Sequence, residues 1–159
     1  GGPAWQKDST YLYLSGEYAD EAASLFSGGP LVAEVIGTEA GRASALKMCY
    51  AAKTKGTTAL LCAVAATAES LGVSRELQHQ WNRDLPGSAE KTLAEISRVS
   101  VKAWRFTGEM EEIAETFSEA GVPGGFHLAA AEIYGRLKDF KDKTGFPDLA
   151  RVVDALLQR

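Results

Sequence analysis

The spacing of apolar residues changes near residue 38. Before that point, residues 9–16 (STYLYLSG) alternate with a period of two, and residues 31–37 (LVAEVIG) form a second short, β-branched run. Between them, Ala22, Leu25 and Phe26 recur at helical spacing behind an acidic first turn, and two glycines follow. The pattern predicts a strand, a short helix and a second strand. Two strands alone leave unpaired edges, so this unit is typical of the tail of a larger sheet domain whose start is missing.

From residue 38 onward, the apolar positions recur at helical spacing. A long first helix is expected over residues 39–71, capped by Thr38, ended by Gly72 and rich in small residues that let other helices approach closely. Further helices are expected over residues 74–83 and 87–100, from Trp104 or Thr107 to Ala120, and over residues 126–143 and 146–157. The clearest apolar stripe consists of Met110, Ile113, Ala114 and Phe117. The chain is therefore predicted to be mainly α-helical, with a strand-helix-strand unit over residues 1–37 and an all-helical domain over residues 38–159.

Composition narrows the classes of partner. The 159 residues carry a net charge of −4, and basic residues do not cluster with aromatic ones, so nucleic acid is not expected to bind. The apolar run at residues 57–68 is shorter than the roughly 20 residues that cross a bilayer, so no membrane partner is expected. Cys49 and Cys62 fit neither a zinc site nor a disulfide framework, and both are predicted to be buried free thiols of a cytoplasmic protein.

Common catalytic and cofactor motifs are missing from the sequence. The dinucleotide fingerprint G-x-G-x-x-G is absent, so this chain alone is not expected to bind a nicotinamide cofactor tightly. His79 and His127 lie far apart in unlike contexts, and no metal site is expected. The acidic run formed by Glu109, Glu111, Glu112 and Glu115 is predicted to be a solvated helix face, because these positions face away from the apolar stripe of the same helix.

Lys47 is the first candidate for chemistry. Ala43 and Ser44 precede it by one helical turn, and Tyr50 and Ala51 follow it by one turn, so its surroundings are small and half-polar. A partly desolvated lysine would have a lowered pKa and could exchange a proton with a substrate oxygen near neutral pH. The alternative is that the side chain extends along the helix into water.

Trp104 and Arg105 are a second candidate, in the segment KAWRF. Arg105 can grip a carboxylate through two hydrogen bonds beside the aromatic ring. An aromatic anchor between two helices is an equally good interpretation.

Three segments carry a resemblance to a known family. They are GRASALKMCYAAKTKGTTALL (residues 41–61), KAWRFTGEMEEIA (102–114) and AGVPGGFHLAAAEIY (120–134). The first resembles the start of the C-terminal helical domain of the β-hydroxyacid dehydrogenase and 6-phosphogluconate dehydrogenase-like superfamily. All three resemble a branch of that superfamily with a C-terminal domain of unknown function. The resemblance covers almost the whole chain and implies an all-α domain preceded by a remnant of a Rossmann domain.

The resemblance also implies roles for individual residues. In the family a glycine precedes the catalytic lysine by six residues, and Gly41 and Lys47 match, so Lys47 is expected to be the general acid or base. Gly2 resembles a substrate-loop glycine, and Tyr50, Trp104, Arg105 and His127 are weaker candidates for the substrate pocket. The family's asparagine one turn after the lysine is replaced here by Tyr50 and Ala51, so that substrate contact does not transfer. A Lys-Asp pair that approaches the nicotinamide in the family is replaced by Gly108-Glu109, so that cofactor contact does not transfer.

The resemblance implies that the chain is the C-terminal part of an oxidoreductase that uses NAD or NADP and acts on a β-hydroxyacid or a related hydroxy or carbonyl compound. The chain alone is expected to be inactive and to form a homodimer through its helical domain. The rival interpretation is a non-catalytic helical module for dimerisation or binding that has lost the cofactor domain.

Overall fold

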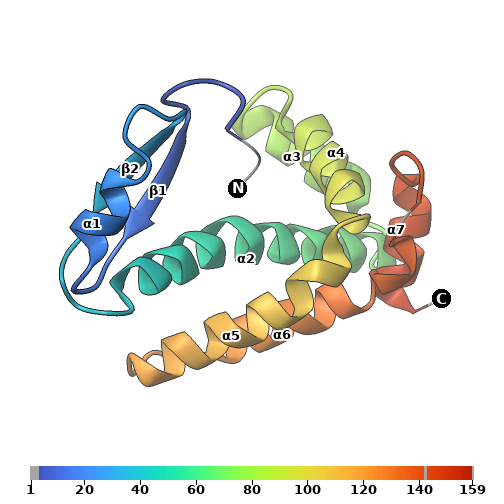
Figure 1. Ribbon diagram of the computed structural model, residues 1–159. Coiled ribbons are helices and arrows are strands. Elements are labelled where there is room, and N and C mark those ends of the chain that lie inside the picture. The colour runs from blue at the N-terminus through green and yellow to red at the C-terminus, as the bar shows by residue number, and fades with distance from the viewer. Residues whose placement is uncertain (1–3, 142, 159) are drawn as a thin grey trace. The chain divides into compact units, whose positions relative to one another are not determined.

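The computed structural model describes residues 4–141 and 143–158, so Gly2 lies outside the described residues. It consists of two strands, seven α-helices and two short 3₁₀ helices within these ranges (Figure 1). In chain order they are β1 (Thr10–Leu14), α1 (Ala19–Ser24), β2 (Leu31–Val35), α2 (Arg42–Ser70), α3 (Ser74–Asp84), α4 (Ser88–Ser100), η1 (Ala103–Arg105), α5 (Phe106–Glu119), α6 (Gly125–Gly135), η2 (Lys138–Phe140) and α7 (Leu149–Leu157). The predicted fold class, a helical domain after a βαβ unit, is confirmed.

The chain divides into two compact units, Gly1–Tyr50 and Ala51–Arg159, and the division falls inside α2. The sequence pattern placed a boundary after residue 37, where the periodicity changes. The compact first unit also includes the first turns of α2.

The first unit is built on a parallel pair of strands. Thr10 lies opposite Leu31 and Leu14 opposite Val35, and α1 provides the crossover and packs against both strands. Ala19 of α1 is buried at this contact. Tyr11 and Tyr13 point to the other face, where both are exposed. A crossover helix between parallel strands is the arrangement that the alternating pattern of this segment predicted.

The start of α2 differs from the expected start. The helix begins at Arg42, not at Glu39, and Thr38 does not cap it. Gly41 has φ +92°, a backbone conformation that favours glycine, and it turns the chain into the helix. The Ser15 hydroxyl then accepts a hydrogen bond of 3.0 Å from the Ala43 amide. The capping group therefore comes from the end of β1, which local sequence rules do not anticipate.

The second unit has a core of helix-to-helix contacts. Helices α5 and α6 pack against each other as an antiparallel pair, and α4 contacts both α3 and α7 (Figure 1). The stripe predicted on α5 is confirmed for Met110, Ile113 and Ala114, which are buried, while Phe117 is half-buried. The fully buried side chains include Ile96, Met110, Ile113, Tyr134, Leu137, Val152 and Leu156.

The helices of the C-terminal segment are shorter than predicted. The helix predicted over residues 126–143 ends at Gly135, and the short η2 follows. Leu137 and Phe140 are both buried, so the chain turns here to place two apolar side chains in the core. The last helix begins at Leu149, not at Phe146, because the Asp148 side chain caps it by accepting a hydrogen bond from the Ala150 amide.

The two cysteines differ in exposure. Cys62 is fully buried in α2, as predicted, but Cys49 is exposed, so the expectation for that residue was wrong. The surrounding sequence predicted that both cysteines lie in a helix, but it could not predict which of them faces the core and which faces solvent. Burial raises the pKa of the Cys62 thiol to about 12, and the nearby Glu95 carboxylate adds to the effect.

We expect one thiol of the native chain to react with an aromatic disulfide reagent near neutral pH. Cys49 is open to solvent, whereas Cys62 is both buried and protonated, so it supplies almost no thiolate. Both thiols should react after unfolding in guanidinium. The Cys49→Ser variant, which should show no rapid reaction, identifies the reactive residue. Rapid reaction of that variant would contradict the burial of Cys62.

Candidate functional site

The carboxyl ends of β1 and β2 meet the start of α2. The Gly16 amide donates a hydrogen bond of 3.1 Å to the Gly37 carbonyl, and these residues follow the two strands. Ser15, next to Gly16, caps α2 through its hydroxyl. Gly37 has φ +134°, and a Cβ atom there would lie 3.2 Å from Cδ of Arg42. In α/β proteins, ligands bind at the carboxyl ends of parallel strands. The first unit therefore brings α2 to the edge of the sheet where a substrate is expected.

Lys47 lies close to this edge. It is five residues after Arg42, which corresponds to about 7.5 Å along the helix axis. Its side chain is exposed, so this chain by itself does not provide the desolvated surroundings that its small neighbours suggested. Tyr50, one turn later, is 69% exposed and lies on the same side of the helix. Lys47 and Tyr50 are thus both accessible to a ligand that approaches this side of α2.

The residues of the first unit do not fit the diphosphate of a nicotinamide dinucleotide. The turn after β1 has a single glycine, Gly16, followed by Glu17. It leads into α1, which has six residues and carries Asp20 and Glu21 in its first turn. A diphosphate site needs closely approaching backbone amides and a positive helix end, and these carboxylates would repel it. In residues 4–141 and 143–158, no three His, Cys, Asp or Glu side chains form a group that could hold a metal.

The second unit contains an ion pair that the sequence pattern did not predict. The Lys55 ammonium lies 2.5 Å from Oε1 of Glu109 and 4.9 Å from the centre of the Phe106 ring. The Tyr134 hydroxyl donates a hydrogen bond of 2.6 Å to the Lys55 carbonyl, and its ring meets Phe106 edge-on. The prediction that Glu109 lies on a solvated helix face is therefore wrong, because its carboxylate pairs with Lys55 and links α5 to α2. Sequence spacing within one helix carries no signal for such a pair.

Trp104 and Arg105 lie in η1, directly before α5. Arg105 is exposed, and Trp104 is 41% exposed, with the Lys141 ammonium 4.2 Å from the centre of its ring. Their neighbour Ala103 is fully buried and anchors the short helix. The arrangement leaves the Arg105 guanidinium available to a carboxylate while the tryptophan stacks on a lysine of the same unit.

His127 lies in the first turn of α6 and is only 4% exposed. Its ring centre is 4.5 Å from that of Phe117 and 5.1 Å from that of Phe126, both in edge-to-face geometry. Nδ1 has no hydrogen-bond partner among the described residues. Burial lowers the pKa of the imidazole below its usual value, so the ring is neutral in the native protein near pH 7.

The candidate residues of the second unit do not form one cluster. Trp104 and Arg105 precede α5, whereas His127 packs beside Phe117, near the end of α5. Phe106 and Phe117 are separated by about 16 Å along the helix axis. A small substrate that contacts Arg105 of one chain therefore does not reach His127 of the same chain.

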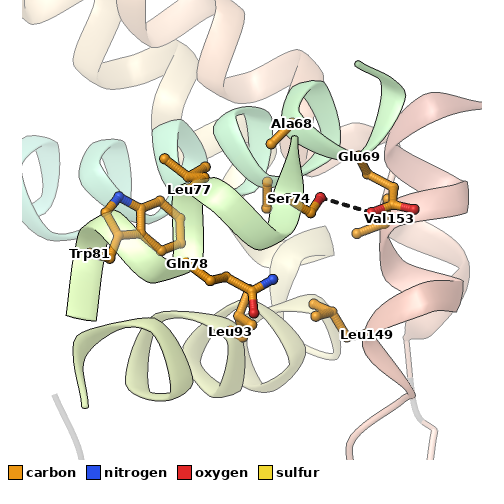
Figure 2. Close-up of a pocket in the computed structure, with 10 residues that line it drawn as sticks. Ala68, Glu69, Ser74, Leu77, Gln78, Trp81, Leu93, Leu149 and Val153 are labelled. Atoms are coloured by element: carbon orange, nitrogen blue, oxygen red, sulfur yellow. Dashed lines mark hydrogen bonds between the residues drawn. The ribbon is translucent and has the colours of Figure 1, made fainter. Parts of the chain in front are cut away.

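A small pocket lies between α2, α3, α4 and α7, away from all of these residues (Figure 2). Its volume is about 50 Å³, and Figure 2 shows its mostly apolar lining, with a hydrogen bond of 2.8 Å between Ser74 and Glu69. Ligand sites of drug-sized molecules are usually of about 300–1,000 Å³. We interpret the pocket as a packing gap between helices. Its lining residues include Leu77, Gln78, Trp81, Leu93, Leu149 and Val153.

Comparisons with known proteins agree with this architecture. Residues 68–137 match the family DUF1932, a domain of unknown function. A conserved hypothetical protein from Sinorhizobium meliloti 1021 has 26% identity and a TM-score of 0.73, and the match covers 93% of this chain and 51% of that one. The conserved protein MTH1747, of unknown function and with structural similarity to 3-hydroxyacid dehydrogenases, has 28% identity and a TM-score of 0.66, with coverages of 87% and 54%. No curated protein matches the sequence.

The chain spans about half the length of both solved structures. The matches confirm the resemblance to the 6-phosphogluconate dehydrogenase-like and β-hydroxyacid dehydrogenase-like proteins. They also support a domain of the kind found in such oxidoreductases. Within the described residues, no helix combines the length and the apolar character needed to cross a bilayer.

Proposed function

We propose that this chain is the substrate-binding and dimerisation part of a cytoplasmic NAD(P)-dependent oxidoreductase that acts on a β-hydroxyacid or a related hydroxy or carbonyl compound. The observation that carries the proposal is the position of Lys47. It stands on the helix that begins at the carboxyl ends of β1 and β2, and the Ser15 hydroxyl fixes the start of that helix. This edge is where α/β proteins bind substrates. The similarity of MTH1747 to 3-hydroxyacid dehydrogenases supports the same reaction class.

In this proposal, Lys47 exchanges a proton with the oxygen of the reacting carbon. The ammonium form donates the proton when a carbonyl is reduced, and the neutral amine accepts it when a hydroxyl is oxidised. Because Lys47 is exposed in this chain, its desolvation has to come from the bound substrate and from surfaces that close over it. Tyr50 is placed one turn away to orient the substrate. Gly2, Trp104, Arg105 and His127 are weaker candidates for contact with it, and Arg105 and His127 of one chain cannot both contact the same small substrate.

The dinucleotide has no binding site among the described residues of the first unit, because its acidic turn disfavours a diphosphate. We therefore propose that NAD or NADP is held by other parts of the full-length protein, and that this chain alone is inactive. The experiment is to assay the full-length protein with panels of β-hydroxyacids and NAD⁺ or NADP⁺, following the absorbance of the reduced nicotinamide. Turnover supports the proposal. Full-length protein that neither binds a dinucleotide nor turns over any substrate would favour a non-catalytic binding module.

We also propose that the helical unit pairs with a second copy of the chain. A shallow groove of about 300 Å³ runs between α2 and α6 and is almost entirely apolar. Leu60 and Phe126 lie along it and are about half exposed. Small residues such as Ala63 and Ala129 line its floor and would allow close approach of another helix.

We expect sedimentation equilibrium to show a dimer of the chain, and the Ala63→Glu variant to be a monomer. A carboxylate in the apolar groove would be buried without a partner in the dimer, but it stays solvated in the monomer. Ala94→Glu places the same substitution at an exposed position of α4 and should leave the dimer intact. A monomeric parent chain, or equal effects of the two substitutions, would exclude this groove as the interface.

A further inference from the structure

We propose that His127 is an acid-sensitive latch, which holds the first turn of α6 against α2 and α5 while it is neutral and releases that turn when it is protonated. The proposal is independent of the chemistry proposed for Lys47. It starts from a buried titratable side chain that packs against the Phe117 and Phe126 rings and approaches the backbone of Gly56.

His127 is packed closely between Gly56 of α2 and the Phe117 ring of α5. A Cβ atom added to Gly56 of α2 would lie 3.6 Å from Nδ1 of His127 and 3.1 Å from Cε1 of Phe126. The Phe117 ring closes the side toward α5. Nδ1 therefore has no acceptor within the described residues, so protonation would leave an N–H donor unpaired in a residue that is only 4% exposed.

The charged residues on the surrounding elements do not offset that charge. On α2, Lys53 lies one turn before Gly56 and has the same sign as a protonated imidazole. On α5, Glu115 and Glu119 lie two positions to either side of Phe117, and both are exposed. On α6 itself, Glu132 pairs with Arg136. Burial is accordingly the cause of the lowered pKa of His127.

Release is expected to be local because the two ends of α6 are held differently. Beyond its first turn, the helix is anchored by Tyr134, which is fully buried and donates a hydrogen bond to the Lys55 carbonyl. The first turn has no side-chain cap, and Leu128, next to His127, is 55% exposed. The leading amides of any helix also lack partners within it, so opening this turn breaks few hydrogen bonds.

The sign of the pH dependence follows from linkage. In the opened turn, His127 has its ordinary pKa near 6.5, and in the closed turn its pKa is lower. The open form therefore binds more protons at pH values between the two, and the closed form is fully favoured above pH 6.5. As the pH falls below 6.5, the opening equilibrium should rise by about tenfold per pH unit until the lower pKa is reached.

Hydrogen exchange on the full 159-residue chain tests the latch, with intrinsic exchange rates corrected for pH. We expect protection of the His127 and Leu128 amides, which donate hydrogen bonds to the Gly124 carbonyl, to fall by about tenfold per pH unit below 6.5, while α7 keeps its protection. His127→Phe keeps an aromatic ring at the site and should remove the pH dependence. His79→Phe alters the other histidine, which is exposed, and should leave the dependence unchanged.

Three results would overturn the proposal. They are protection of α6 that does not vary with pH, an equal loss of protection in α7, and an unaltered pH dependence in His127→Phe. If that variant does not fold, an NMR titration of the parent chain decides the question. The proposal requires the ring of His127 to titrate below 6.5, and titration at or above that value would overturn it.

Discussion

Replacing Gly124 by alanine is expected to destabilise the chain by about 3 kcal/mol, which is large for the addition of one methyl group. Gly124 precedes α6 at the point where the chain turns back from α5. A Cβ atom there would lie 2.4 Å from the Ala114 carbonyl oxygen and 2.8 Å from Oγ of Ser118. Real Cβ contacts are not that short, so α5 and α6 would have to move apart. Gly124 has an ordinary helical φ of −80°, and the effect would therefore come from packing and not from backbone strain.

The neighbouring glycine provides the control. Gly125 begins α6, and a Cβ atom at that position would meet nothing within 4 Å. Gly125→Ala should change stability by less than about 1 kcal/mol and in the stabilising direction, because alanine loses less backbone entropy than glycine in a helix. Urea unfolding followed by circular dichroism measures both variants. Equal stability of the two would show that the helices do not approach as closely as described.

A further variant identifies the atom responsible. In Ser118→Ala combined with Gly124→Ala, the hydroxyl contact is removed but the Ala114 carbonyl stays in place. Because a main-chain oxygen cannot rotate away as a side chain can, we expect the double variant to recover little of the lost stability. Full recovery would assign the clash to Ser118 instead.

The two adjacent glycines show where prediction from sequence ends. The segment GVPGG was correctly predicted to break the helices, because proline and paired glycines interrupt helical periodicity. Nothing in that pattern distinguishes Gly124, where a Cβ atom would collide with α5, from Gly125, where it would meet nothing within 4 Å. The distinction depends on how two helices pack, and that packing involves residues far apart in the chain.

Contacts between different helices and strands also explain the other differences between the predicted and the observed structure. Ser15 caps α2 from the end of β1, and Glu109 pairs with Lys55 from another helix, so no local pattern predicts either role. The helix expected to reach residue 143 ends at Gly135, because Leu137 and Phe140 enter the core. Element types were predictable because periodicity within one segment determines them. Lys47 was singled out first by its small neighbours and then by a family resemblance, and the structure adds its position near the sheet edge.

Replacing Lys47 by methionine in the full-length protein is expected to lower kcat by about 10²- to 10⁴-fold, the usual contribution of a general acid or base. Methionine keeps the length and the apolar stem of the side chain but cannot carry a proton. Dinucleotide affinity should stay nearly constant, because the proposal assigns no cofactor contact to this residue. Lys53→Met makes the same change at another exposed lysine of α2 and should leave kcat close to that of the parent protein.

Lys47→Arg separates proton transfer from simple attraction of an acidic substrate. Arginine preserves the positive charge but stays protonated throughout the accessible pH range, so it cannot act as the base. If Lys47 moves a proton, the arginine variant should lose kcat for hydroxyl oxidation almost as fully as the methionine variant, with a smaller change in KM. If Lys47 only binds a carboxylate, the arginine variant should retain kcat, and the methionine variant should mainly raise KM. Retained kcat in both variants would exclude Lys47 from the chemistry and leave the exposed Tyr50, one turn away, as the next residue to test.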